Sequence, residues 1–384
     1  MALAGGHFLA LLPRSDPQAP TSSNELDIRR RVAREQPANR RPHNEKTHKV
    51  AASRNLRYAQ EGPLFLKLRS VQKKTQDRYE QLINGFTLFL VANYAVNLNG
   101  LAPGELMDKA MCDFIHVMFW EGAPLSQAKA FFSAMCWRYP QISRHGHVPL
   151  AETKQALTGF SRLSPVTGRL ALPEAVIDGL LNALVAMGHL NLARACRLGM
   201  AMYLRPGEMM TLTVGQLTPP TIGAGVDAWS VVLHPREFMV SSKVHEYDDG
   251  LLLDGPLATW LGEIAAVLTH GRAPSDRLVE ETPEQFRQLF RAAAERCNIM
   301  ILEPIPYHLR HSGASLDLVR NWREIPAVKR RGRWASDRSM HRYLKGGRVA
   351  EQFRRLPKSV QEYCERCQRG IGEILSGRSP PLRV

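Results

Sequence analysis

The stretch ARACRLGMAMYLRPGEMMTLTVGQL, residues 193–217, begins with an apolar helical pattern and then breaks at a proline and a glycine. The pattern predicts a helix over 191–203 that ends before Pro206. Arg205 stands at this end, next to apolar residues, where a charged side chain needs an anionic partner. Glu208 follows three residues later and can orient the guanidinium group. The alternative interpretation of Arg205 is a simple helix cap that interacts with the helix dipole.

Two further stretches carry chemically useful residues. In PYHLRHSGAS, residues 306–315, Tyr307, Arg310 and His311 recur at spacings of three and four with Ala314, so they lie on one side of a predicted helix. In RGRWASDRSMHRYLK, residues 331–345, Trp334 precedes Tyr343 by nine residues. These stretches therefore supply basic, aromatic and imidazole side chains in a fixed order.

Periodicity predicts a chain that is mainly α-helical. Apolar spacings of three and four indicate helices that include 75–91, 107–120, 126–138, 173–187 and 283–297. Between them, β-branched and aromatic segments at 230–234, 238–242 and 251–253 indicate a small antiparallel β-sheet, with a turn at Asp248-Asp249-Gly250. Lys243 falls at the tip of one predicted strand. We therefore expect a mainly α fold with a small antiparallel β-sheet, an α+β class.

The charge is strongly positive and uneven. The 384 residues include 51 Lys and Arg against 36 Asp and Glu, a formal net charge of +15. Residues 1–70 hold 13 basic and 6 acidic side chains, and residues 310–355 hold 13 and 4, so two segments account for the whole excess. A basic chain of this kind usually binds a polyanion, most often nucleic acid. An acidic protein or an anionic membrane surface is the alternative partner.

Cysteine content and hydropathy narrow the cellular setting. The six cysteines are too sparse for a disulfide scaffold, and Cys364-x-x-Cys367 lacks the second pair that a zinc site needs. No apolar run is long enough to span a bilayer, and the opening MALAGGHFLALL lacks the basic start of a secretion signal. We expect no metal, no membrane partner and no secretion, with a location in the nucleus of a eukaryote or otherwise in the cytoplasm.

Transfer of a phosphodiester without a metal sets three chemical requirements. The non-bridging oxygens gain negative charge in the transition state, so fixed bidentate cations are needed, and Arg suits this better than Lys. A covalent nucleophile and an acid that protonates the leaving 5′ oxygen are also needed. The chain offers such groups in one order, from Arg205 through Lys243 and Arg310 to Tyr343.

This ordered set resembles the tyrosine recombinases, also called phage-integrase-type recombinases, over roughly residues 64–345. Their catalytic domain has an R-x-x-E turn, a Lys on a β-hairpin, an H-x-L-R-H box, a Gly-His or Trp element, and a Tyr nine residues later. The matching residues here are Arg205 with Glu208, Lys243, Leu309-Arg310-His311, Trp334 and Tyr343. The versions carried by mobile elements of eukaryotic microbes look most similar.

The resemblance implies a mechanism and a set of partners. Tyr343 attacks the scissile phosphate of double-stranded DNA and forms a 3′-phosphotyrosyl bond, while Arg205 and Arg310 hold the phosphate with Trp334. Lys243 protonates the leaving oxygen. No cofactor is needed because the covalent intermediate conserves the bond energy. The resemblance also implies a homo-oligomer, a dimer on each site and a tetramer in the synapse.

Composition, helical periodicity and the resemblance together divide the chain into four parts. These are a basic disordered arm (1–63), a helical core-binding domain that contacts DNA (64–164), the catalytic domain (165–345) and a C-terminal tail (346–384). Beside Trp334, the basic run and its flank predict phosphate contacts. The DNA-binding candidates are Lys329, Arg330, Arg331, Arg333, Arg342 and Lys345.

One position departs from the family pattern. Tyr307 stands where the family usually has His, with His308 one place later, and a tyrosine is a poor base near neutral pH. His308 and His311 are therefore supporting candidates. A DNA-binding protein on the same fold that has lost catalysis is the alternative function. A third interpretation is an RNA-binding or chromatin adaptor protein whose match to the motifs is accidental.

Overall fold

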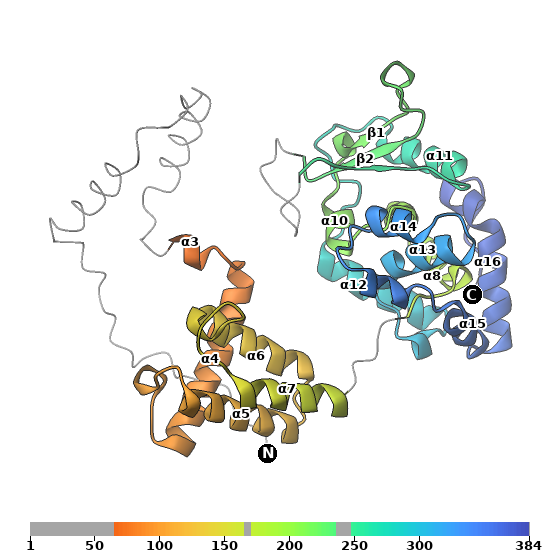
Figure 1. Cartoon of the computed structure of the whole chain (residues 1–384). Coiled ribbons are helices and arrows are strands. Elements are labelled where there is room, and N and C mark those ends of the chain that lie inside the picture. The colour runs from red at the N-terminus through yellow and green to blue at the C-terminus, as the bar shows by residue number, and fades with distance from the viewer. Residues whose placement is uncertain (1–64, 165–169, 236–246, 384) are drawn as a thin grey trace, which may run out of the picture. The chain divides into compact units, whose positions relative to one another are not determined.

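The computed structural model describes residues 65–164, 170–235 and 247–383. The predicted arm 1–63, the predicted strand 238–242 and Lys243 lie outside these residues. The chain divides into two compact units, Met1–Pro165 and Val166–Val384. Within the described residues the predicted fold class is confirmed, because helices predominate and the strands form a single three-stranded antiparallel sheet (Figure 1).

The first unit is helical throughout its described part, and the predicted helices 75–91, 107–120 and 126–138 are confirmed with slightly longer bounds. Its core includes a cluster of aromatic rings among aliphatic side chains, in which the ring centroids of Phe114 and Phe131 lie 4.9 Å apart, edge to face. The elements are α3 (Phe65–Leu68), α4 (Lys73–Tyr94), η1 (Leu98–Gly100), α5 (Glu105–Trp120), α6 (Leu125–Arg138), η2 (Pro140–Ile142) and α7 (Ala151–Leu163).

A buried carboxylate fixes the start of α7. The oxygens of Asp108, on α5, accept the backbone N–H groups of Glu152 at 3.0 Å and Thr153 at 2.9 Å. These are N–H groups of the first turn, which have no partner inside their own helix. Asp108 therefore joins the two helices and also stabilises the helix terminus electrostatically.

The second unit consists mostly of helices. Its small sheet lies at one end of the unit, beside α11 (Figure 1). Its helices are α8 (Glu174–Ala186), α9 (Leu190–Ala201), α10 (Pro206–Thr211), α11 (Ala258–Thr269), α12 (Pro283–Arg296), α13 (Tyr307–Val319), α14 (Ile325–Arg331), α15 (Gly346–Arg354) and α16 (Lys358–Ser376). Short 3-10 helices are η3 (Val214–Gln216), η4 (Ile222–Ala224), η6 (Met300–Leu302) and η7 (Asp337–Arg342).

The sheet has the order β1 (Leu217–Thr218), β2 (Ser230–Leu233) and β3 (Asp249–Leu252). The predicted turn at Asp248-Asp249-Gly250 is wrong, because Asp249 and Gly250 belong to β3 and pair with Leu233 and Val232. The left-handed backbone of Asp248, with φ of 53°, lies just before β3, and its N–H donates to the carbonyl of His234 at 3.1 Å. The strand therefore begins two residues earlier than its apolar pattern indicates.

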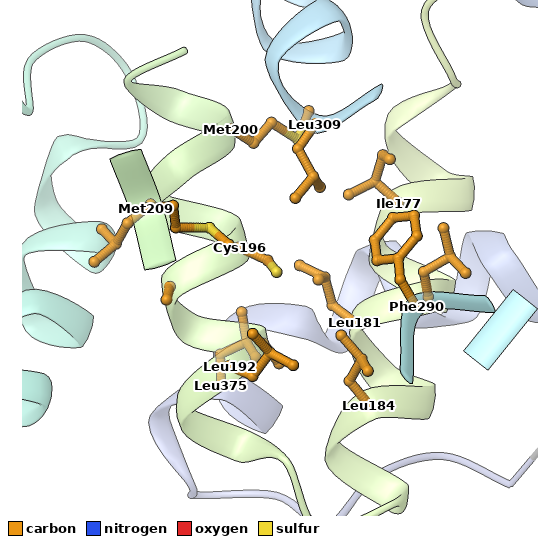
Figure 2. Packing of buried hydrophobic residues seen from close by; sticks show 14 of the residues in the cluster. Ile177, Leu181, Leu184, Leu192, Cys196, Met200, Met209, Phe290, Leu309 and Leu375 are labelled. Carbon is orange, nitrogen blue, oxygen red and sulfur yellow. The ribbon is translucent and has the colours of Figure 1, made fainter. Parts of the chain in front are cut away.

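The core of the second unit forms between α8 and α9. Figure 2 shows apolar side chains of these helices pointing toward one another, with Phe290 of α12 and Leu309 of α13 beside them. Residues 346–384, separated as a tail on sequence grounds, form α15 and α16 in the described structure. Leu375 and other residues of α16 belong to this same core. The helix is thus part of the second unit's packing.

Candidate active site

Arg205 lies at the corner between α9 and α10, and Glu208 holds it there. The carboxylate of Glu208 accepts the backbone N–H of Arg205 at 2.8 Å and also the Arg205 guanidinium group. The side chain of Arg205 is 22% exposed, so solvent or a ligand can reach it. The predicted orientation of Arg205 by Glu208 is present, with Arg205 as the N-cap of α10.

Glu208 also binds Arg333, a contact that the sequence does not indicate. Arg333 donates two hydrogen bonds to the Glu208 carboxylate, at 3.0 and 2.8 Å, in the fork geometry typical of Arg–carboxylate pairs. Burial alone raises the pKa of Glu208, but the nearby Arg333 and Arg205 outweigh it, and the pKa is lowered. The Glu208 side chain is therefore held ionised between two guanidinium groups.

Arg310 lies on α13 and is almost fully buried, with 1% of the residue exposed. Its two terminal nitrogens donate to the backbone carbonyls of Tyr203 and Gly332. The guanidinium carbon also lies 4.7 Å from the centroid of the Trp334 ring. Burial, followed by repulsion from Arg205 and Arg333, lowers the pKa of Arg310 to about 10. Arg310 is thus a buried cation surrounded by neutral acceptors and other cations.

Close backbone approach makes this arrangement possible. A Cβ atom at Gly313 would lie 2.0 Å from the carbonyl oxygen of Met200, so only glycine lets α13 pack against the end of α9. Tyr203 at the same corner has a left-handed backbone, with φ of 51°, and its carbonyl accepts Arg310. Arg205 follows two residues later. The two predicted phosphate-binding arginines are therefore brought to one corner of the second unit.

Tyr343 follows η7 and lies against the same group of side chains. Its ring centroid is 4.7 Å from that of Trp334 and 5.3 Å from that of His311. Its hydroxyl group is 2.9 Å from Nδ1 of His311. Tyr343 is only 2% exposed, so the hydroxyl is inside the protein in this structure.

Tyr307 and His308, at the start of α13, contact different parts of the second unit. Tyr307, the first residue of α13, is half-buried, and its ring centroid is 5.0 Å from that of His311. His308 is buried, and its Nδ1 accepts the backbone N–H of Ile305 at 3.1 Å. His308 therefore stabilises the segment before the helix, and His311 contacts the candidate nucleophile.

An open pocket adjoins Arg205. It has a volume of about 860 Å³, and its lining includes Arg205, Glu208 and Tyr307 together with an apolar floor around Phe286. His234, which follows β2, lines it as well, with Nε2 3.9 Å from Oε1 of Glu208. His234 is not among the site residues predicted from the sequence, although its position at the end of a predicted strand could have indicated a place in the site.

The basic segment before Tyr343 is divided between buried and exposed side chains. Arg331 and Arg333 are 8% and 5% exposed, and both bind carboxylates, Asp254 and Glu208 respectively. Lys329 pairs with Asp337 at 2.6 Å. Arg330 and Lys345 are exposed, and the side chain of Arg342 lies outside the described structure. Two of the predicted phosphate contacts, Arg331 and Arg333, are thus engaged within the fold.

One group of side chains has the composition of a metal site. Cys112, Asp113 and His116 of α5 each place a ligand atom within 4.8 Å of the others. However, Asp113 already accepts the hydroxyl of Tyr94 at 2.5 Å and lies 3.4 Å from the Lys109 ammonium group. This cation and this donor already satisfy the carboxylate, so we assign no metal to it.

The arrangement in the second unit gathers groups that suit oxyanion binding and nucleophilic attack, with Arg310 and Tyr343 buried in this structure. Arg205 and Arg310 provide guanidinium groups, Tyr343 provides a phenol, and His311 can accept the phenolic proton. Within the described residues, no helix is both long and apolar enough to cross a membrane.

Among solved structures, two recombinases are similar to this chain. No protein-family model matches the chain, and no curated protein matches it. The chain is similar to XerH site-specific recombinase bound to palindromic difH substrate in a post-cleavage complex, with a TM-score of 0.46 and 13% identity over 66% of this chain and 72% of that chain. It is also similar to XerA recombinase, with a TM-score of 0.34 and 14% identity over 79% of this chain and 95% of that chain.

Proposed function

We propose that this protein is a site-specific DNA recombinase that breaks and rejoins strands through a 3′-phosphotyrosyl intermediate. The observation that carries the proposal is the closed ring of contacts around Arg310. Arg310 donates to the carbonyls of Tyr203 and Gly332. Arg205 follows Tyr203 by two residues and Arg333 follows Gly332 directly. Both of these arginines bind the carboxylate of Glu208. Residues from distant parts of the chain thereby form one cationic site with Tyr343 beside it.

In the proposed reaction, the Tyr343 oxygen attacks the phosphorus of a DNA phosphodiester. A bond forms between the phenolic oxygen and phosphorus, and the bond from phosphorus to the 5′ oxygen breaks. His311 accepts the phenolic proton, for which its Nδ1 is placed at 2.9 Å. Arg205 and Arg310 stabilise the charge on the non-bridging oxygens, Trp334 packs against the same group, and Lys243 protonates the leaving oxygen.

The free protein has to change before Tyr343 reaches DNA. Arg310 and Tyr343 are 1% and 2% exposed, and both contact the Trp334 ring. We infer that DNA binding moves the Gly332 carbonyl, Trp334 and Tyr343 away from Arg310, while Arg333 keeps its pair with Glu208. The phosphate then replaces the carbonyl of Gly332 as an acceptor for Arg310. This exchange is favourable because a charged acceptor forms the stronger hydrogen bond.

Double-stranded DNA is the proposed partner, and a dimer on each site and a tetramer in the synapse are the proposed assemblies. The exposed Arg330 and Lys345 lie on either side of Tyr343 in the sequence and are free to contact phosphates. The net charge of +15 supports the same partner. Because the proposed substrate is DNA, the proposed location is the nucleus of a eukaryote or otherwise the cytoplasm.

The test is covalent capture on nicked DNA. The full chain is incubated with a pool of nicked duplexes that carry a randomised central window, and adducts stable in SDS are collected. We expect adducts from the wild type and none from Tyr343→Phe, which keeps the ring packing. Equal DNA retention by both proteins, with no adduct from either, contradicts the enzyme.

A DNA-binding protein that has lost catalysis is the second candidate. It is favoured by Tyr307 in place of the usual His and by the burial of both Arg310 and Tyr343. In that case the nicked pool is bound in a salt-dependent manner, and Tyr343→Phe changes neither binding nor adduct yield.

A further inference from the structure

His234 lies in the pocket next to Arg205, in the part of the site where the family's usual histidine is replaced by Tyr307. The pocket is lined by His234, Arg205, Glu208 and Tyr307, so these residues surround one open volume of about 860 Å³. The His234 side chain is 23% exposed, close to the 22% of Arg205. A ligand that reaches Arg205 from this pocket therefore also reaches the imidazole.

The backbone fixes this position. His234 follows β2 with a left-handed φ of 52°, an uncommon conformation for a residue with a side chain. Its carbonyl accepts the N–H of Asp248, which is itself left-handed and precedes β3. The two residues thus close the base of the hairpin. Backbone conformations that cost energy often occur at functional sites, where the fold holds them in place.

Among the residues that the structure describes, none forms a hydrogen bond with the imidazole of His234. Nε2 of His234 is 3.9 Å from Oε1 of Glu208, which is beyond hydrogen-bonding distance. Both Glu208 oxygens already accept guanidinium donors, from Arg205 and Arg333. The ring therefore faces the pocket beside Arg205, with a nitrogen available for a ligand.

We infer that His234 is a phosphate-binding residue that donates a hydrogen bond to the same phosphate as Arg205. This inference rests on the proposed function and names a substrate contact for it. The described lining of the pocket carries three arginines, Arg205, Arg287 and Arg291, against the two carboxylates Glu208 and Glu303, besides Tyr307. Arg287 and Arg291 also pair with Glu284 and Glu295, so Arg205 is the arginine of the lining that lies beside His234 and Glu208. An anion next to His234 is therefore the favoured ligand. His234 supplies the imidazole that the first position of α13 lacks.

The test is titration of the full chain with inorganic phosphate, followed by NMR of nitrogen-labelled histidine rings. His234→Gln identifies the His234 signal by its loss. We expect a saturable shift of that signal. We also expect phosphate affinity about tenfold weaker in His234→Ala, as for the loss of one hydrogen bond to a charged group. His234→Gln, which retains a donor, keeps most of the affinity. His270→Ala, an exposed histidine after α11, is the matched control and binds as the wild type does.

The outcomes separate this inference from the proposed function. If Arg205→Ala loses phosphate affinity while His234→Ala does not, or if the His234 signal stays fixed, the role of His234 is wrong and the anion site stands. If wild-type protein binds no phosphate, or Arg205→Ala binds normally, the anion site itself is wrong. Covalent capture with Tyr343→Phe tests the proposed chemistry separately, because it depends on the nucleophile.

Discussion

Arg333 and Arg310 are neighbouring buried guanidinium groups that the fold neutralises in different ways. Arg333 forms a two-point pair with the carboxylate of Glu208. Arg310 has the carbonyls of Tyr203 and Gly332 and the face of Trp334, and no described carboxylate pairs with it. The difference shows in the pKa of Arg310, which burial and then the neighbouring cations lower to about 10.

The comparison separates a structural cation from a functional one. A buried charge whose partner is fixed contributes to a defined local structure, and loss of the partner is costly. A buried cation without an anionic partner lowers the free energy of unfolding. Its presence in the fold is explained when an anionic ligand supplies the partner. Arg333 fits the first description and Arg310 the second.

Removal of Glu208 tests the first half of the comparison and has the largest expected effect. Glu208→Ala removes the two-point partner of Arg333, whose side chain is 5% exposed, leaves it with Asp249 at 3.3 Å, and also releases Arg205. We expect the free energy of unfolding to fall by about 3 kcal/mol or more, measured by urea denaturation of the full chain. Glu295→Ala removes an exposed carboxylate paired with Arg291 and should cost about 0.5 kcal/mol or less. Equal losses in the two variants would show that the buried pair does not stabilise the corner.

Gly332→Ala tests the neutral side of the comparison. A Cβ atom at Gly332 would lie 1.7 Å from the Trp334 ring, and the Gly332 carbonyl is an acceptor for Arg310. The ring must move, so we expect a loss of about 1–3 kcal/mol in unfolding free energy and a change in tryptophan fluorescence. Gly347→Ala, with no atom near the added Cβ, is the control and should be neutral or slightly stabilising. An unperturbed fluorescence spectrum in Gly332→Ala would contradict the tight stacking of Trp334 on Arg310.

The helical pattern and the residues at its ends were predictable because they depend on local spacing. The start of the predicted helix 283–297 at Pro283 and the shared side of Tyr307 and His311 both appear in the structure as expected. Gly313 was not singled out, although its close approach to Met200 sets how deeply α13 packs. Local sequence indicates elements well, and it says less about which element approaches another.

The divided fate of the basic run was not predictable for the same reason. Arg330 and Arg333 look alike in the sequence, yet one is exposed and the other is buried on Glu208. The left-handed backbone of Arg333, with φ of 53°, directs it inward after α14. The buried position of the Arg333 side chain depends on the carboxylate of Glu208, which lies 125 residues earlier in the sequence. His234 was missed because its pocket joins β2 to α10 and α13, which is a tertiary relation.

Replacement of each arginine by methionine compares the two cations directly. Arg310→Met removes a buried charge that lacks a carboxylate but also leaves two carbonyls without a donor, so we expect stability within about 1 kcal/mol of the wild type. Arg333→Met should lose about 3 kcal/mol, because buried Glu208 loses a paired cation. Arg310→Met should nevertheless form no covalent adduct with nicked DNA. A strongly destabilised Arg310→Met protein would show that Arg310 is mainly structural.

Another buried guanidinium group, that of Arg197, has two carboxylate partners, and one of these carboxyl groups has a strongly shifted pKa. Its terminal nitrogens lie 2.5 Å from Glu174 and 3.3 Å from Asp178, and Glu174 also pairs with Arg320 at 2.6 Å, so among the described residues Asp178 has Arg197 alone as an ion-pair partner. Complete burial, and then the charge of Glu174, raise the pKa of Asp178 to about 7 despite Arg197.

The pH dependence of stability follows from this shift, because the folded protein holds a proton on Asp178 that the unfolded chain releases above its ordinary value of 3.8. The stabilising contribution is present below that value and declines as pH rises through about 7. The free energy of unfolding of Asp178→Asn, relative to that of the wild type, should therefore increase when the pH is raised from about 5 to about 8. Urea midpoints of both proteins at the two pH values measure this change. Asp337→Asn, at a side chain that is 81% exposed, should show no such gain. Parallel midpoints for Asp178→Asn and the wild type would mean that Asp178 stays ionised beside Arg197. Burial would then not remove the charge of Asp178, and the lowered pKa of Arg310, whose largest cause is also burial, would lose its meaning as a sign of an anion site.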